Sequence, residues 1–345
     1  MNEVPGFPLI AKKGWLLKKP AILTESSPLP GWNPYFKEQE ARRLEGLNVD
    51  YVALKSRLMP KRNRPWDGEA YRILDVIPTD DDLRMTFGVA GYFHYVNTCE
   101  AAAVELADVV RSNSAGGIPK ASEHRGPPEA IFDLEGRSRI AAVNCILILK
   151  NYSVGAYSDQ TRRQVNKFVL HERGESVLSG QNCTHVVPAG THQPLSKGFG
   201  DLNEISIWQT AIREFCEELF NKEELAKFKR LGESFLDLPE IKPYVNAFFR
   251  SGAATVYLMG VGLEPLTMNF EILTAIVADW SKASTSAILK FDENYEGKIH
   301  FVDLTRENLK TEAVRVRNGR EMTPAAKACL LLAAEHYPAL MGPPP

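Results

Sequence analysis

The stretch Arg213–Phe220, with the sequence REFCEELF, constrains this chain more than any other part of it. Together with the segment before it, the stretch has apolar residues at helical spacing: Ile205, Trp208, Ala211, Ile212, Phe215 and Leu219. We therefore predict one helix with a buried stripe, on which Glu214 shares a face with Glu217 and Glu218. A run of charges is also typical of a solvated helix face. Three carboxylates this close nevertheless repel one another, which favours positive charge between them, from Arg213 and from a hard cation such as Mg²⁺ or Mn²⁺.

The order of these residues resembles the core of the Nudix box, G-x5-E-x7-R-E-U-x-E-E-x-G-U, in which U is an apolar residue. The matching positions are Arg213, Glu214, Phe215, Glu217 and Glu218. Upstream, five residues separate Gly198 from Glu204, as in the family, but eight residues instead of seven separate Glu204 from Arg213. Downstream, Phe220 and Asn221 stand where the pattern has its last glycine and apolar residue. The resemblance is therefore close at the carboxylates and irregular at both ends.

A second segment resembles the start of such a box. The run His185–Gly190, HVVPAG, has the form of a strand followed by a P-x-G turn. If Gly190 is the box glycine, thirteen residues lie between it and Glu204. Long loops are often functional, so we predict that residues 191–203 lie beside the carboxylates and shape the pocket.

The resemblance implies a fold and an activity. It implies a Nudix-like α/β/α sandwich with a mixed β-sheet and a hydrolase that cleaves a diphosphate linkage in a nucleoside diphosphate joined to another group. It also implies Mg²⁺ or Mn²⁺ held by Glu214, Glu217 and Glu218, with Glu204 as a weaker member of the set. Arg213 would orient the carboxylates through charge-assisted hydrogen bonds.

The general base of such a hydrolase is not fixed by the box, since family members place it in the box or in a later loop. Glu217, Glu264 and Glu271 are candidates, and Glu264 is the better one outside the box because it lies at a predicted strand connection. His185 and His192 flank the P-A-G turn and could contact phosphate, although a lone histidine is more often structural. Cys216 is a poor nucleophile, because the neighbouring carboxylates suppress its thiolate form.

A second function stays open at this point: a non-hydrolytic sensor or binding protein that has the Nudix fold and recognises a nucleotide-like ligand. The complete set of Arg213, Glu214, Glu217 and Glu218 favours hydrolysis. The altered end of the box, the long loop and the large N-terminal region favour binding alone.

Composition and charge exclude several other classes. The net charge of -2 gives no overall basic field for nucleic acid, and the local basic cluster Lys55, Arg57, Lys61, Arg62 and Arg64 is more typical of a solvated linker. Five scattered cysteines indicate free thiols in a reducing compartment. No apolar run has the length of a signal or membrane-spanning segment, so we expect a cytoplasmic protein with a small nucleotide-like diphosphate as substrate and no membrane partner. Its oligomeric state, a homodimer included, stays open.

Along the chain, residues 1–134 are predicted to form an α+β extension that packs on a Nudix-like domain at 135–345. The predicted strands are 71–77, 84–95, 140–149, 167–173, 184–188, 253–263, 270–278 and 298–303. The predicted helices, besides the carboxylate helix, are 36–47, 98–110, 223–231 and 322–337. The run Ile140–Leu149 is apolar throughout and suits a central strand that is buried on both faces.

Overall fold

The computed structural model describes most of the chain. The described residues are 4–33, 51–58, 67–112, 128–154, 163–174, 182–195, 202–220, 234–283 and 297–342. The helices expected at 36–47 and 223–231 lie outside these residues, as does the second half of the basic cluster at 55–64.

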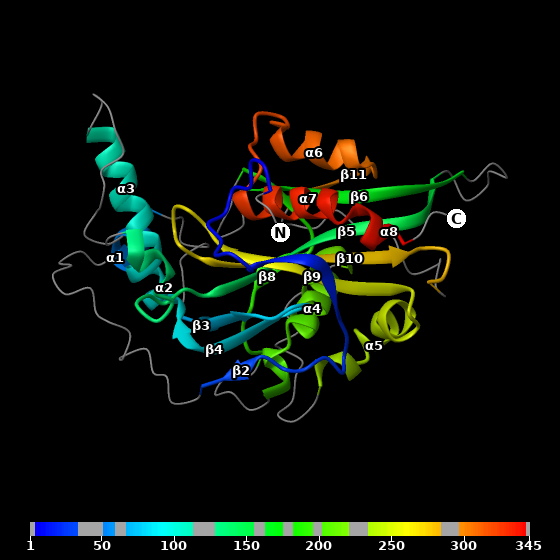
Figure 1. Ribbon diagram of the computed structural model, residues 1–345, viewed down its shortest axis with the longest axis horizontal. Helices are drawn as coiled ribbons and strands as arrows, with labels where there is room; N and C mark the ends of the chain where they lie inside the picture. The colour runs from blue at the N-terminus through cyan, green and yellow to red at the C-terminus, as the bar shows by residue number, and fades with distance from the viewer. Residues whose placement is uncertain are drawn as a thin grey trace.

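The fold is mixed α/β, built on one large mixed sheet (Figure 1). Its main path runs β1-β9-β10-β5-β6-β11, in which only β10 and β5 are parallel neighbours. The strands are β1 (Leu16–Leu23), β5 (Ala141–Val154), β6 (Arg163–Arg173), β7 (Thr184–Val186), β8 (Ala189–Thr191), β9 (Ala254–Leu263), β10 (Phe270–Asp279) and β11 (Gly297–Asp303).

Two short strands fill the gap where β5 and β6 separate. The second half of β5 pairs with β6, whereas its first half pairs with β8, and the end of β6 pairs with β7. The Val187–Pro188 peptide that joins β7 to β8 is cis. The segment 184–191 therefore crosses from one strand to the other in the middle of the sheet.

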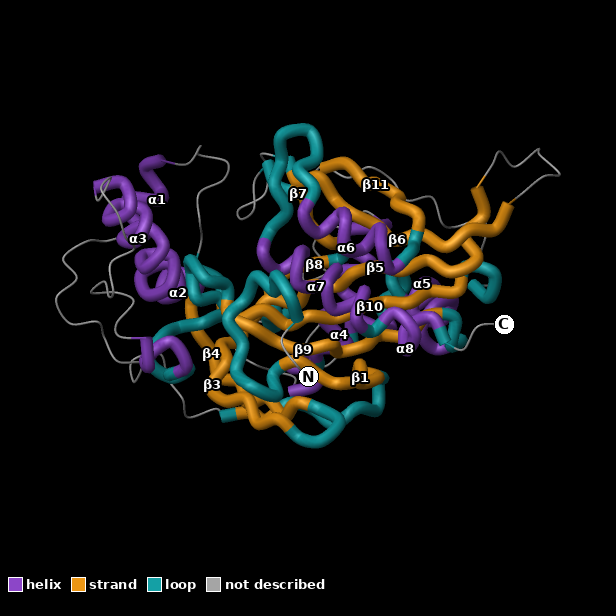
Figure 2. The backbone as a smooth tube through the Cα atoms, turned by 45° about the horizontal axis from the view of Figure 1, so that its top comes forward, coloured by secondary structure: helices purple, strands orange, loops and turns teal. Residues whose placement is uncertain are grey.

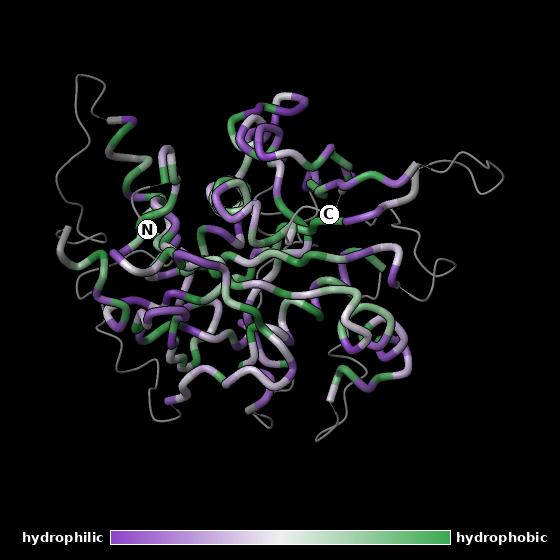
Figure 3. Tube along the Cα trace, turned by 45° about the vertical axis from the view of Figure 1, so that its right-hand side comes forward, coloured by the Kyte–Doolittle hydropathy of each residue, from purple (hydrophilic) through white to green (hydrophobic). Residues whose placement is uncertain are grey.

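Alternation along β5 shows that helices cover both faces of this sheet. Val143, Cys145 and Leu147 belong to a core shared with α4 (Ile207–Phe220), whereas Ile146 and Ile148 belong to a core shared with α7 (Pro324–Glu335). Successive strand residues point to opposite faces. Figure 1 accordingly shows α7 above and α4 below the strands, and Figure 3 shows the apolar residues gathered along the central strands.

The N-terminal part joins this sheet in two ways. Strand β1 pairs with β9 at its edge. A smaller sheet, β2 (Gly31–Trp32), β4 (Leu83–Gly91) and β3 (Glu69–Pro78), touches the large one where Arg72 bridges to Ile140. Figure 2 shows β3 and β4 beside the large sheet, with α1 (Tyr51–Leu58), α2 (Tyr92–Tyr95) and α3 (Ala101–Ser112) beyond them. The domain boundary at 134/135 stays a prediction.

The remaining helices are short or lie on the outside of the molecule. They are η3 (Val96–Glu100), η4 (Pro128–Phe132), η5 (Leu202–Ile205), η7 (Phe235–Asp237), α5 (Lys242–Tyr244), η8 (Val245–Arg250), α6 (Arg306–Val314) and α8 (Tyr337–Met341). Pro324 lies in the first turn of α7, as its sequence predicts. None of the helices in the described ranges is long and apolar enough to cross a membrane.

Two local predictions were wrong. The strand expected at 84–95 ends at Gly91, and the chain continues as the helix α2, because Tyr92 and Tyr95 pack against one another beside α1 instead of extending the sheet. The expected P-A-G turn is strand β8, because Ala189 and Gly190 find ladder partners on β5. A turn signal in the sequence does not exclude a strand when a neighbouring strand offers a free edge.

Candidate functional site

Helix α4 presents its carboxylates to the backbone of β8. One face of α4 fills the core with Phe215, Cys216 and Leu219, and a neighbouring face lies against β8. The helical prediction from periodicity is confirmed, with α4 beginning two residues after Ile205.

Arg213 and Glu214 form a buried ion pair at this contact. The Nη2 and Nε atoms of Arg213 donate to Oε1 of Glu214 at 2.6 and 3.2 Å. The same guanidinium donates to the backbone carbonyls of Thr191 and Gln193 at 2.7 and 3.0 Å. Burial by itself lowers the pKa of Arg213, but the charges of Glu214 and Glu217 outweigh burial and raise it. Arg213 therefore fixes both Glu214 and the chain that leaves β8.

Gly190 makes the position of Glu214 feasible. A Cβ atom placed on Gly190 would lie only 2.2 Å from Cδ of Glu214. The backbone of Gly190 does not have positive φ. Glycine is therefore required here for close approach and not for an unusual backbone conformation.

Glu218 and Glu217 differ in their surroundings. Oε2 of Glu218 accepts a hydrogen bond from the backbone N–H of Ala189 at 3.1 Å, and the residue is 6% exposed. The side chain of Glu217 is 24% exposed and lies 3.9 Å from Nε of Arg213. Glu214 and Glu218 thus flank Ala189 and Gly190, whereas Glu217 lies at the rim of the helix.

These residues can be tested for fit to a divalent cation. In the part of the chain that the structure describes, no three His, Cys, Asp or Glu side chains are arranged to hold a metal ion. Consecutive Glu217 and Glu218 project about 100° apart around the helix, so Glu217 does not face β8 as Glu218 does. Cation binding by Glu214, Glu217 and Glu218 together stays a prediction. Magnesium, however, is usually held by one or two carboxylates together with substrate phosphates. Glu214 and Glu218 lie one turn apart on α4, and both face the backbone of β8, so they match that smaller number of carboxylates.

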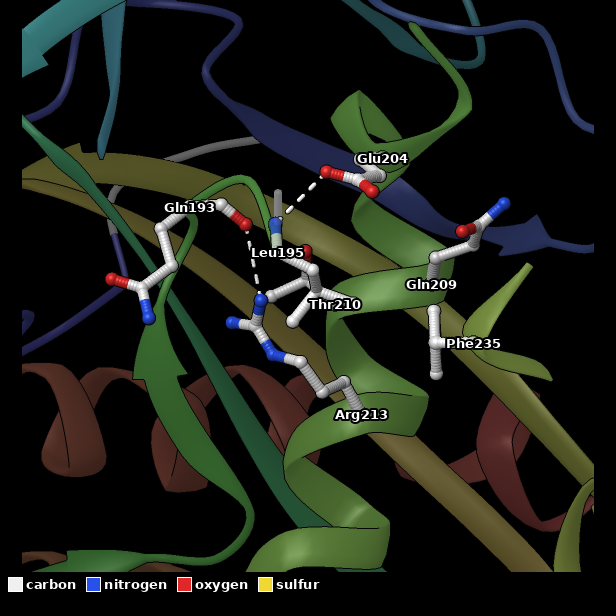
Figure 4. A pocket seen from close by; sticks show the side chains of 7 residues that line it. All are labelled: Gln193, Leu195, Glu204, Gln209, Thr210, Arg213 and Phe235. Atoms are coloured by element: carbon white, nitrogen blue, oxygen red, sulfur yellow. Dashed lines mark hydrogen bonds between the residues drawn. The ribbon is translucent and has the colours of Figure 1, made fainter. Parts of the chain in front are cut away.

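Glu204 does not join the carboxylates on α4. It precedes α4 in η5, is buried, and accepts a hydrogen bond from the N–H of Leu195 at 2.9 Å. It lines a small hollow at the N-terminal end of α4, together with Gln193, Leu195, Gln209, Thr210, Arg213 and Phe235 (Figure 4). Residues 191–195, the described start of the 191–203 loop, therefore run beside α4, and Glu204 holds Leu195 there. That the loop as a whole shapes the pocket stays a prediction.

His192 has a structural position. Its Nδ1 lies 2.8 Å from the hydroxyl of Thr210, and its ring packs on Tyr71 and Phe87. Burial, and next the charge of Arg213, lowers the pKa of His192 to about 3, so this ring is neutral at physiological pH. It ties the small sheet to α4.

Two of the candidates for a general base, Glu264 and Glu271, lie outside the Nudix-like box and have other surroundings than Glu217. Oε2 of Glu264 accepts from the N–H groups of Leu266 and Thr267 and from the Thr267 hydroxyl, so Glu264 closes the β9–β10 turn. Glu271 is buried and accepts from the amides of Asn144 and Asn269 at 2.7 and 2.9 Å. Val143 and Cys145 face α4, so Asn144 between them points to the α7 side of the sheet. Glu271 accepts a hydrogen bond from Asn144 and therefore lies on the α7 side as well. Of the three candidates for the general base, Glu217 is the one on α4, beside Glu214 and Glu218.

Comparison with known proteins gives no family for this chain: no protein-family model matches it, and no curated protein matches it in sequence.

Replacing Gly190 by alanine should destabilise the protein by about 1–3 kcal/mol, the usual cost of overpacking. The added methyl group would overlap the carboxylate of Glu214, which Arg213 holds in place. The free energy of unfolding from urea titrations measures this cost. The same substitution in a Glu214→Ala background should cost much less, and an equal cost in both backgrounds would show that the overlap is not the cause.

The sequence did not point to Gly190 as a packing partner of Glu214 or to the carbonyls of Thr191 and Gln193 as partners of Arg213. The only signal for Gly190 was a lone glycine inside a strand-like run, which often marks a close backbone approach. The carbonyl contacts have no signal, since any residue supplies a carbonyl group.

Proposed function

We propose that the protein is a Mg²⁺- or Mn²⁺-dependent hydrolase of a diphosphate linkage, with a Nudix-like sandwich around the large sheet. The observation that carries this proposal is the pair of buried carboxylates, Glu214 and Glu218, one helical turn apart over Ala189 and Gly190. Two ionised carboxylates at such a contact repel one another, so a cation between them would stabilise the contact. Arg213 already donates a hydrogen bond to one carboxylate oxygen of Glu214.

The residues of the chain would divide the work. Glu214 and Glu218 would hold the cation, and Arg213 would keep Glu214 in position through its bond to the carboxylate. Glu217, at the solvent-facing rim, would accept the proton of the attacking water. When bound, the cation supplies charge that neutralises phosphate oxygens and activates water. The substrate class proposed is a nucleoside diphosphate joined to a second group.

The experiment is a screen of nucleoside diphosphate conjugates with Mg²⁺ and Mn²⁺. Cleavage of the linkage gives two phosphate monoesters, so the readout is the phosphate that an added phosphatase releases from these products. On a substrate that the screen finds, Glu217→Gln should lower kcat by about 10²-fold or more. Glu307→Gln, on the exposed first turn of α6, is a matched control and should leave kcat unchanged. Turnover near the wild-type level in Glu217→Gln, with an unchanged melting temperature, would show that Glu217 is not the general base.

A binding protein without catalysis is the second candidate, and one observation favours it. Glu214 and Glu218 both have hydrogen-bond donors within the chain, Arg213 and the N–H of Ala189. In this case calorimetry would detect a nucleotide-like ligand that is never hydrolysed, and Glu217→Gln would bind it with unchanged affinity.

A further inference from the structure

A cluster of polar side chains lies on the paired ends of β6 and β7. His171 is the register partner of His185, and the N–H of Arg173 donates to the carbonyl of Cys183. Residues 171 and 173 point to the same face of β6, because they are two positions apart. We call His171, Arg173, Cys183 and His185 the β6–β7 polar cluster.

The cluster is on the same face of the sheet as α4. Leu170 and Val186, which are also register partners, lie in the core that α7 shares. Their neighbours His171 and His185 therefore point to the opposite face. Glu172 points to the α7 side and contacts Arg320 and His300 there, so it does not serve the cluster.

Three nitrogen atoms of the cluster are buried and have no hydrogen-bond partner among the described residues. They are Nε2 of His171, Nε of Arg173 and Nδ1 of His185. His171 is 1% and His185 is 8% exposed, whereas Arg173 and Cys183 are half-buried, so the cluster is closed on its inner side and open towards solvent at its outer end. A buried polar atom without a hydrogen-bond partner destabilises the folded protein, and a bound ligand that supplies the partner would remove this cost.

The charges around the cluster favour an anion over a metal cation. Burial and next the charge of Arg173 lower the pKa of His171 to about 4, and burial followed by Arg173 also lowers that of His185. Both rings are therefore neutral at pH 7, and each can place one N–H on its unpartnered nitrogen, since the tautomer is set by the partner. A cation would be repelled by the guanidinium of Arg173, whereas an oxyanion would receive bonds from all three groups.

We propose that His171, Arg173 and His185 form a binding site for a tetrahedral oxyanion, either inorganic phosphate or the phosphate group of a larger molecule. The site does not depend on the hydrolase proposal, because it uses none of the carboxylates of α4. Along the chain, His185 is four residues before Ala189, so the two sites share the β7–β8 segment. A phosphate ester bound here would have its remaining part on the α4 face.

The test uses the full chain in EDTA, so that the carboxylates of α4, without a cation, repel phosphate. Inorganic phosphate should shift the imidazole NMR resonances of His171 and His185 in a saturable way and raise the melting temperature, whereas chloride at equal ionic strength should not. Arg173→Gln should weaken phosphate binding at least tenfold. Its position is half-buried, so the variant should fold, and circular dichroism checks this. His300→Gln, which removes an imidazole on the α7 side beside Glu172, is the matched control and should leave binding unchanged.

Adenosine monophosphate distinguishes the two sources of the anion. Tighter binding of this ester than of phosphate, lost in Arg173→Gln, would assign the site to a phosphate ester, and binding of phosphate alone would assign it to the free ion. In a parallel titration without EDTA, saturable Zn²⁺ binding at the two histidines, together with no response to phosphate, would overturn the proposal. An Arg173→Gln protein that binds phosphate like the wild type would overturn it as well.

Discussion

Replacing Arg213 by alanine is expected to lower the free energy of unfolding by about 3–5 kcal/mol, the cost of breaking a buried ion pair from one side. Arg213 is 3% exposed and donates to Glu214, Thr191 and Gln193 together. Its removal would leave the carboxylate of Glu214 buried beside Gly190 and two carbonyls without their donor. Urea unfolding followed by circular dichroism measures the change.

The matched control is Arg250→Ala. Arg250 also pairs with two carboxylates, Glu25 and Asp237, but these pairs lie at the surface. Its loss should cost less than about 1 kcal/mol. The double variant Arg213→Ala/Glu214→Ala should recover part of the loss, because it removes the stranded charge as well. Equal costs for Arg213→Ala and Arg250→Ala would contradict the view that burial makes the Arg213 pair important.

The sequence predicts the elements of this fold well where one periodicity dominates. Helix α4 and the strand β10 lie close to their predicted bounds, because their apolar residues recur at helical spacing or without interruption. Strand β5 begins where its apolar run predicts, but it continues to Val154 through polar residues that pair with β6. Strand β1 was not predicted, since Lys18, Lys19 and Pro20 interrupt its pattern. It becomes a strand because β9 offers a free edge, with an irregular register between Leu16 and Ala21.

The candidate site was predicted only in part. Helical geometry shows which carboxylates are neighbours, but the direction in which each one points depends on the phase of α4 against the sheet. The stripe of Phe215 and Leu219 fixes that phase, and it turns Glu214 and Glu218 towards β8 and leaves Glu217 at the rim. The strand β8 has three residues, too few for any pattern, so the surface that receives these carboxylates could not be predicted.

The basic cluster illustrates the same limit. Lys55 looked like part of a solvated linker, yet its ammonium lies 2.6 Å from Glu100 and donates to Tyr92. Charge pairing between α1 and η3 is decided by how the two helices pack, and the sequence separates the partners by 45 positions.

The second large effect concerns Glu271 and pH. Burial, opposed by the hydrogen bonds from Asn269 and Asn144 and assisted by Glu264, raises the pKa of Glu271 from 4.5 to about 7. A carboxyl group with a raised pKa binds its proton more tightly in the folded state. Its stabilising contribution is therefore complete below about pH 4.5 and is lost as the pH rises towards 7, a change of about 3 kcal/mol.

The variant Glu271→Gln isolates this contribution, because glutamine resembles the protonated acid and does not titrate. Relative to the wild type, its free energy of unfolding should rise by about 3 kcal/mol between pH 4.5 and pH 8. The comparison with the wild type is needed because His171 and His192, whose pKa values are lowered, stabilise the protein as the pH rises through the same range. Those histidines titrate alike in both proteins, so they cancel in the difference. A difference that stays constant with pH would mean that Glu271 is ionised in the folded protein, and the amides of Asn144 and Asn269 would then be holding a charge instead of a neutral acid.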